Sequence, residues 1–199
     1  MPDNHDLAFA LYDIGAFKFG TFTLKSGLIS PFYIDFRLLV SHPDILQMSA
    51  TILAQLIAEI HYDRLAAIPY AALPIGVALA LTVKRPLIYP RKERKEHGTA
   101  RLIEGKFNAG ERVLVIDDLI TKGDSKIEAI EPLREAGLQV SDIAVLLDRQ
   151  SGGVKTMASA GVTVHAALRL TDMLDVLQSA GKLDAEQRHT IDTWLKDNS

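Results

Sequence analysis

Apolar positions along the 199-residue chain follow two spacings, one typical of helices and one typical of buried strands. Nearly continuous apolar runs bounded by turn residues predict strands at 65–69, 86–92, 112–118, 142–149 and 162–170. Apolar residues at helical spacing predict helices at 73–83, 125–136, 153–160, 172–180 and 185–196. This alternation predicts an α/β fold in which helices cover both faces of a parallel sheet.

The first sixty residues show a different pattern. Residues 6–17 have amphipathic spacing and predict a short helix. Residues 21–37 predict two strands around a turn at Ser26 and Gly27. Pro43 stands where a helix would begin, and 44–60 continues with helical spacing. The polar stretch 93–110 is predicted to be a long loop.

Composition limits the class of protein. Hydrophobic residues make up 48% of the chain, enough for one substantial core, so we expect one domain over 1–199. The net charge of -3 argues against a general nucleic-acid binder. The absence of cysteine excludes a disulfide framework and a thiolate metal site. We see no signal peptide, and the longest apolar stretch, 71–83, is too short to span a membrane. We therefore expect a cytoplasmic protein without nucleic-acid or membrane partners.

Two adjacent acids end the strand predicted at 112–118. Val113–Ile116 suits a central strand, but the carboxylates of Asp117 and Asp118 cannot stay buried without a partner, so we expect them to emerge at the sheet edge. Ligands of parallel sheets bind beyond the carboxyl ends of the strands. Four other charged residues are predicted at such ends: Arg91, Lys92, Asp148 and Arg149.

The segment after the two acids opens onto a predicted helix. Free backbone N–H groups and the helix dipole make such a segment an anion site, Gly123 permits a tight turn, and Thr121 and Ser125 add hydroxyl donors. Acids for sugar hydroxyls beside a phosphate cradle describe a site for a phosphorylated sugar. In the alternative interpretation, Asp117 and Asp118 simply cap the following turn.

This stretch, VLVIDDLITKGDS, resembles the 5-phosphoribosyl 1-pyrophosphate (PRPP) signature of the type I phosphoribosyltransferases. The resemblance implies their α/β fold, with a small N-terminal hood mainly from residues 1–40. It implies that Asp117 and Asp118 meet the ribose hydroxyls. It assigns the rest of PRPP binding here to Leu119, Ile120, Thr121, Lys122, Gly123, Asp124 and Ser125.

Three further stretches narrow the family. FTLKSGLISPFYID, RKERKEHGT and LLDRQSGG are similar to segments of orotate phosphoribosyltransferase and occur in the order of that family. IPYAALPIG and the tail after Gly152 are most similar to the orotate phosphoribosyltransferase half of UMP synthase. The resemblance extends from about Ile14 to the last predicted helix. It implies transfer of phosphoribose from PRPP to orotate, which gives orotidine 5′-monophosphate and pyrophosphate in pyrimidine synthesis.

A dense basic stretch suits the charged leaving group of this reaction. Residues 84–106 contain eight Lys or Arg and three Glu, a formal charge of +5. The resemblance makes residues 93–107 a mobile lid that is shared across a homodimer, and a closed lid would exclude water. It assigns PRPP or pyrophosphate contacts to Arg91, Lys92, Lys95 and His97, and a catalytic role to Lys95 together with the two acids. A solvated charge run is the alternative interpretation.

The resemblance also assigns a base subsite. The residues of this subsite, which would contact orotate, are Phe32, Tyr33, Thr121 and Arg149. The resemblance assigns Lys25, Tyr70 and Ala71 to PRPP. Taken one by one, each has another explanation. Lys25 could be a surface lysine, the aromatic residues could belong to the core, and Arg149 could pair with Asp148 or Glu131.

Two features depart from the family pattern. Many members carry an aromatic-Lys-Gly triplet where this chain has Tyr70-Ala71-Ala72, so only the backbone position of Ala71 is transferred. The phosphate loop holds Lys122 and Asp124 where small residues are usual. Asp124 should weaken phosphate binding unless its side chain turns outward or a nearby lysine offsets its charge.

Cofactors and partners follow from the same resemblance. The six histidines are scattered without a ligand cluster, so we expect only Mg²⁺, held mainly through PRPP. The chain leaves no room for the decarboxylase half of UMP synthase, so we expect a separate orotidine 5′-monophosphate decarboxylase. Two alternatives stay open, a phosphoribosyltransferase for another base and a PRPP-binding regulatory protein. A DNA-binding regulator should show an added helix-turn-helix or a basic face, and neither is evident.

Overall fold

Six strands form the main sheet of the computed structural model, which describes residues 2–23, 27–91 and 102–198. Their order is β5-β4-β3-β6-β7-β8, and all neighbours are parallel except β5, which is antiparallel to β4. The strands are β3 Arg64–Ala67, β4 Leu87–Pro90, β5 Ile103–Glu104, β6 Arg112–Ile120, β7 Gln139–Asp148 and β8 Thr163–Arg169. The predicted parallel sheet is confirmed.

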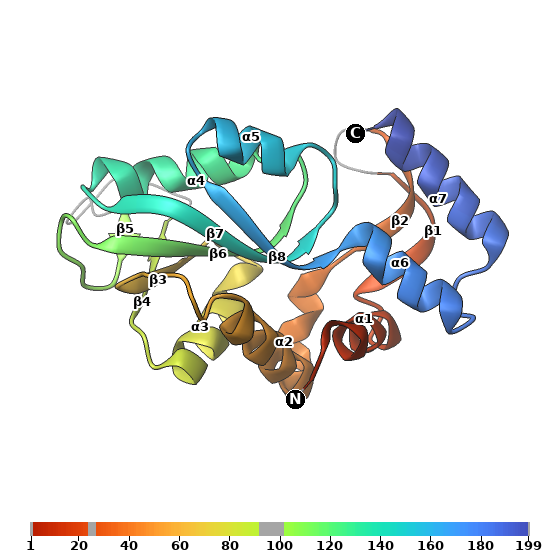
Figure 1. Cartoon of the computed structure of the whole chain (residues 1–199), viewed down its shortest axis with the longest axis horizontal. Coiled ribbons are helices and arrows are strands. Elements are labelled where there is room, and N and C mark those ends of the chain that lie inside the picture. The colour runs from red at the N-terminus through yellow and green to blue at the C-terminus, as the bar shows by residue number, and fades with distance from the viewer. Residues whose placement is uncertain (1, 24–26, 92–101, 199) are drawn as a thin grey trace.

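Helices cover both faces of this sheet (Figure 1). On one face lie α2 (Pro43–Leu56) and α3 (Ala72–Val83), and on the other lie α4 (Asp124–Glu135) and α5 (Gly153–Ser159). Alternate residues of β6 belong to different apolar clusters: Leu114 packs with the side of α2 and α3, and Val115 with the side of α4 and α5. Burial on both faces explains why the strand is continuously apolar.

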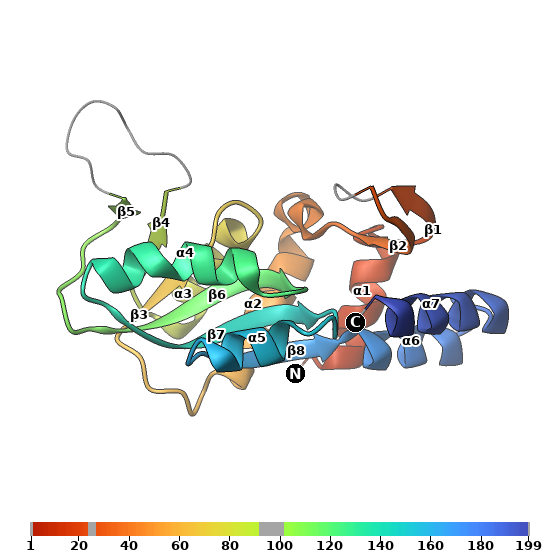
Figure 2. The ribbon, with the colours of Figure 1, turned by 90° about the horizontal axis from the view of Figure 1, so that it is seen from above.

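A smaller layer is built from both ends of the chain. The hairpin of β1 (Phe17–Thr23) and β2 (Ile29–Ile34) lies at the same end of the molecule as α1 (Asn4–Asp13), α6 (Leu170–Ser179) and α7 (Ala185–Asp197) (Figures 1 and 2). Helix α7 packs against β2, where the indole Nε1 of Trp194 donates a 2.6 Å hydrogen bond to the Ile29 carbonyl. The C-terminal helix is therefore attached to the N-terminal hairpin.

Two predicted elements were wrong in detail. The first helix begins and ends earlier than predicted, because Asp3 caps it by accepting from His5 N and Asp6 N, and Phe17 already belongs to β1. The predicted loop 93–110 contains β5, and Arg91 N donates to the Leu102 carbonyl at 2.7 Å beside it. Two residues are too few to show a strand period in the sequence. The 3-10 helix η1 (Phe36–Ser41) was not predicted.

One ion pair holds the entrance of β6 to β3. Arg64, which is 9% exposed, donates from Nε and Nη2 to the two carboxylate oxygens of Glu111, each at 2.6 Å. A third bond joins the same guanidinium to the Lys106 carbonyl. Arg64 and the backbone N–H of Asn108 lower the pKa of Glu111 to about 2. The pair therefore stabilises the fold at neutral pH.

Replacing Glu111 with Gln should make the stability of the protein less dependent on pH in the acidic range. A carboxyl whose pKa is lowered on folding stabilises the native state above its unfolded pKa, and this contribution is lost as the pH falls from about 4.5 toward 2. We expect the urea midpoint of E111Q to lie below wild type at pH 7 and to fall less between pH 4.5 and 3. Glu59→Gln, at an exposed position, is the control. Equal losses in E111Q and wild type over this window would contradict the assignment.

Candidate active site

A cavity of about 760 Å³ opens beyond the carboxyl ends of β3, β4 and β6. Six residues that the sequence assigned to PRPP line it: Tyr70, Ala71, Arg91, Asp117, Asp118 and Ser125. Lys126 and Arg37, which had no assigned role, line it as well. The structure therefore brings residues from five separate segments to the sheet edge where ligands of parallel sheets bind.

The two acids lie within β6, which continues to Ile120 in register with β7. Asp117 is 3% exposed, so the expectation that both carboxylates emerge is wrong for this residue. It stays buried because the Lys126 ammonium forms an ion pair with its Oδ2, while Oδ1 accepts from Asp118 N at 2.8 Å. Burial raises the pKa of Asp117, and the Lys126 charge acts in the opposite direction.

Asp118 is only half-buried and faces the same cavity. Its Oδ1 accepts from the backbone N–H of Leu119 at 2.8 Å, and this bond stays within the strand. Helix α4 has Gly123 at its N-cap and no side-chain cap. The alternative that these acids cap the following turn is therefore not what the structure shows.

The loop between β6 and α4 has the form of an anion cradle. Gly123 has φ +93°, a left-handed conformation that favours glycine, and precedes the 12-residue helix α4. The first N–H groups of such a helix have no acceptor within it and attract anions together with the helix dipole. Thr121 is half-buried, whereas Lys122, Asp124 and Ser125 are exposed. Asp124 is thus free of packing that would force its carboxylate onto a bound phosphate.

The start of α5 packs closely against this loop. A Cβ on Gly153 would overlap the Thr121 carbonyl and lie 2.6 Å from Ile120 Cγ1. A Cβ on Gly123 would lie 3.2 Å from the Gly153 carbonyl. The two glycines therefore allow the phosphate loop and α5 to approach each other closely, which fixes the position of the loop.

Arg149, at the end of β7, is a half-buried cation without an acidic partner among the described residues. Its guanidinium carbon lies 5.0 Å from the Phe32 ring centroid and 6.0 Å from that of Trp194. Its buried Nε has no hydrogen-bond partner there, and burial lowers the pKa of the side chain. The two acids suggested as partners are engaged elsewhere, Asp148 with Gln150 N and Glu131 with Arg134.

The two aromatic residues assigned to orotate occupy different environments. Phe32 is 1% exposed, with its ring 5.8 Å from that of Phe17, so its ring belongs to the core and supports Arg149. Tyr33 is half-buried, and its hydroxyl accepts from Arg37 Nη2 at 3.1 Å. No sequence pattern pointed to Arg37 or Trp194. Arg37 forms an ion pair with the nearby Asp35, whereas the ring partner and the hydrogen-bond acceptor of Trp194 lie far away in sequence, in β2.

The remaining assigned residues lie around the cavity or outside the described part. Tyr70 is 63% exposed, and Ala71 is the N-cap of α3. Arg91 Nη1 lies 3.2 Å from Glu104 Oε1, so the arginine joins β4 to β5. Four assigned residues lie outside the described residues, namely Lys25, Lys92, Lys95 and His97. Of the lid predicted at 93–107, the structure describes 102–107 only.

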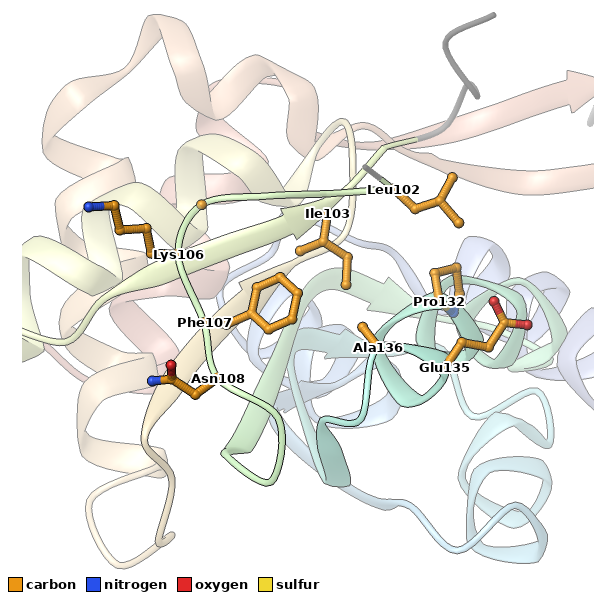
Figure 3. Close-up of a pocket in the computed structure, with 9 residues that line it drawn as sticks. Leu102, Ile103, Lys106, Phe107, Asn108, Pro132, Glu135 and Ala136 are labelled. Carbon is orange, nitrogen blue, oxygen red and sulfur yellow. The ribbon is translucent and has the colours of Figure 1, made fainter. Parts of the chain in front are cut away.

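A second cavity, of about 770 Å³, adjoins the first and shares Leu102, Pro132 and Glu135 with it. Figure 3 shows it between the segment 102–108 and the end of α4, with Phe107 and Ile103 facing Ala136. It contains neither the paired acids nor a helix N-terminus. The first cavity is therefore the better candidate for a phosphorylated sugar.

The charged groups of the first cavity suit Mg²⁺ that arrives with a ligand. Among the described residues, no group of three or more His, Cys, Asp or Glu is placed to hold a metal ion. Asp117 and Asp118 offer carboxylates, and Mg²⁺ commonly binds through one or two carboxylates plus substrate phosphates.

In the described part of the chain, no helix has the length and apolar character needed to cross a membrane.

Comparisons with known proteins place the chain in one family. The family described as phosphoribosyl transferase domain matches residues 38–164. The chain is 40% identical to uridine 5′-monophosphate synthase of Bos taurus over 97% of its length and 41% of the relative. It is 37% identical to orotate phosphoribosyltransferase of Pyrobaculum islandicum, covering 92% of the chain and 94% of that relative.

Solved structures give the same result. UMP synthase of Leishmania donovani superposes with a TM-score of 0.91 at 39% identity, over 98% of this chain and 43% of that one. The chain spans about two fifths of the length of the UMP synthases it matches, and nearly the whole of the orotate phosphoribosyltransferase from P. islandicum. The chain therefore belongs to the phosphoribosyltransferase family, as a relative of the orotate phosphoribosyltransferases and of the corresponding part of UMP synthase.

Proposed function

We propose that this protein is an orotate phosphoribosyltransferase. It transfers the phosphoribosyl group of PRPP to a ring nitrogen of orotate, giving orotidine 5′-monophosphate and pyrophosphate in pyrimidine synthesis. The observation that supports this most strongly is one cavity in which paired acids, Asp117 and Asp118, lie beside the N-terminus of α4. Those groups match the hydroxyls and the phosphate of a phosphorylated sugar, and the relatives' names supply the reaction.

The acids and the loop hold the sugar in this proposal. The carboxylates of Asp117 and Asp118 accept hydrogen bonds from the ribose hydroxyls, and the loop 121–125 donates N–H groups to the 5′-phosphate. Bond breaking at the anomeric carbon leaves an electron-poor sugar, which nearby carboxylates stabilise electrostatically. Lys126 forms an ion pair with Asp117 in the buried strand, and its charge opposes the rise in the pKa of this carboxyl that burial causes.

Orotate binds through its own charge. Its carboxylate needs a cation, and Arg149 is a half-buried cation without an acidic partner among the described residues. Phe32 and Trp194 hold the guanidinium by ring contacts, which leaves its N–H donors for a ligand. Thr121 and Tyr33 complete the base subsite in this proposal.

The leaving pyrophosphate is met by cations. Arg91 lines the cavity, and the resemblance of RKERKEHGT to the family supports the same role for Lys92, Lys95 and His97. Mg²⁺ bound mainly through PRPP would neutralise charge on the leaving group. Closure of the lid 93–107 would keep water away from the activated sugar.

A homodimer belongs to the proposal, because the lid is expected to reach the neighbouring subunit. An exposed apolar stripe on α3 supports it: Val77 is 50% and Leu81 64% exposed, one helical turn apart. Val40, on the adjoining η1, is also exposed. Two such stripes facing each other would bury apolar area around a two-fold axis.

Replacing Leu81 with Ser should weaken the dimer by about tenfold, because one exposed leucine would no longer be buried between subunits. Sedimentation equilibrium of L81S against wild type measures the change. Val154→Ser, at a 45% exposed residue of α5, is the matched control. A monomeric wild-type protein, or equal effects in both variants, would contradict this interface.

The cellular context completes the proposal. We propose that the protein acts in the cytoplasm and that its product passes to an orotidine 5′-monophosphate decarboxylase. The chain matches about two fifths of the length of the UMP synthases, and this match supports the proposal. Co-purification of the full chain with that decarboxylase tests the association, and its absence at micromolar concentrations would exclude a stable complex.

The activity is tested by orotate consumption with PRPP and Mg²⁺, each omitted in turn, with the product identified by mass. We expect turnover only with all three, and a marked fall in Lys95→Ala. Uracil, adenine and hypoxanthine are offered as competing acceptors. Transfer to one of them instead of orotate would assign another base, and PRPP binding without any transfer would favour a regulatory protein.

A further inference from the structure

The C-terminal helix reaches the base subsite through one residue. Trp194 of α7 contacts Phe32 edge-to-face, with ring centroids 5.4 Å apart, and lies 6.0 Å from the guanidinium carbon of Arg149. Phe32 lies 5.0 Å from the same carbon. The two rings thus form an aromatic seat for the one cation of the subsite that has no acidic partner among the described residues.

This seat is held in place from the hairpin side. The indole Nε1 of Trp194 donates to the Ile29 carbonyl at 2.6 Å, which attaches α7 to the first residue of β2. The backbone N–H of Arg149 donates to the Ile120 carbonyl at 3.0 Å, just before the phosphate loop. Arg149 is therefore held at two points. The sheet holds its backbone, and the two rings contact its guanidinium.

We propose that Trp194 is a positioning residue for the base subsite, which holds the Arg149 guanidinium ready for the carboxylate of the acceptor base. The inference deepens the proposed function and rests on it. An arginine with a free tip would lose several rotamers on binding the base. Contact with two rings restricts the planar guanidinium in advance while leaving its N–H groups available to an anion.

The competing explanation is that Trp194 only packs α7 onto the hairpin. The two explanations differ in which kinetic parameter changes. A packing role predicts lower stability with proportionate loss of all activity. A positioning role predicts a weaker interaction with orotate, no change for PRPP, and an effect that disappears when Arg149 is absent.

The test compares Trp194→Leu, Trp194→Phe and Ile191→Ala. Phe keeps a ring beside Arg149 and lacks the indole N–H, whereas Leu lacks the ring. Ile191, 1% exposed on the same helix, is the packing control. We expect W194L to raise the KM for orotate about tenfold, a size typical of a cation–π contact. The KM for PRPP and kcat should stay within about twofold, and W194F and I191A should leave the orotate KM near wild type.

A double-mutant cycle decides whether Trp194 acts through Arg149. We expect W194L to have no further effect on the orotate KM in an Arg149→Met background, although it raises this KM in the wild type. Additive effects of W194L and R149M would overturn the proposal. So would an equal rise of the orotate KM in W194L and I191A.

Fluorescence gives a readout that needs no turnover, because Trp194 is the single tryptophan of the chain. We expect orotate to change Trp194 emission in a saturable way in wild type and not in R149M, after correction for absorbance. If the wild type does not transfer phosphoribose but shows this response, the proposed reaction fails and the aromatic seat stands. No response to orotate at any concentration up to millimolar would overturn the seat itself.

Discussion

Replacing Asp118 with Asn should lower kcat/KM for PRPP by about 10- to 100-fold. The carboxylate faces the cavity and is only half-buried, and we assign it hydrogen bonds to ribose hydroxyls. A hydrogen bond to a charged group is worth about 1.5–3 kcal/mol, and an amide retains the shape without the charge. Because the amide oxygen can still accept from Leu119 N, the fold should be little affected. Initial rates at varied PRPP measure the loss.

The matched control for this variant is Asp142→Asn. Asp142 lies at the other end of the neighbouring strand β7, opposite Leu114, and its Oδ1 is 2.7 Å from His165 Nε2. It should change stability slightly and leave kcat/KM near wild type. If D118N and D142N had the same kinetic parameters, Asp118 would not be a ligand of the sugar.

Replacing Arg149 with Met should lower kcat/KM for orotate by about 100-fold, most of it through the KM for orotate. Removing one partner of a desolvated charge pair typically costs about 2–5 kcal/mol. Methionine keeps an unbranched apolar stem against Phe32, so the aromatic packing is retained while the cation is lost. The KM for PRPP should change much less, because the phosphate loop and the acids of β6 are intact. Steady-state kinetics with each substrate varied separates the two effects.

Arg169→Met is the control for loss of a positive charge. Arg169 ends β8, is paired in register with Asp148, and is exposed. Loss of a surface charge there should leave both KM values within about twofold of wild type. A rise of the PRPP KM in R149M as large as that of the orotate KM would place Arg149 in the sugar site instead of the base subsite.

Local patterns in the sequence were enough to predict the sheet and the candidate phosphate loop. The continuous apolar run of Val113–Ile116 predicted a strand buried on both faces, and β6 has this property. Gly123 at the start of a helix predicted a tight turn, and its φ of +93° needs glycine. Strand periods, helix spacing and turn chemistry depend on residues a few positions apart, so they can be recognised in the sequence.

The environment of each charge depended on tertiary structure. The sequence predicted that Asp117 would emerge from the sheet, but the first turn of α4 brings Lys126 back over the strand and keeps the acid buried. Likewise, Phe32 was assigned to the base, whereas its ring lies in the core and supports Arg149. A charge can be buried only where another element supplies its partner, and that partner is not local in sequence.

By itself, the sequence determined the α/β sheet, the acidic strand and the loop that opens α4, because each follows from short-range patterns. Tertiary structure alone decided that the two ends of the chain share one layer. There α7 covers the hairpin, and Trp194 meets Arg149 across 44 intervening residues. The physical reason is that the apolar side of the hairpin must be buried, and only the folded sheet places the C-terminal helix within reach of it.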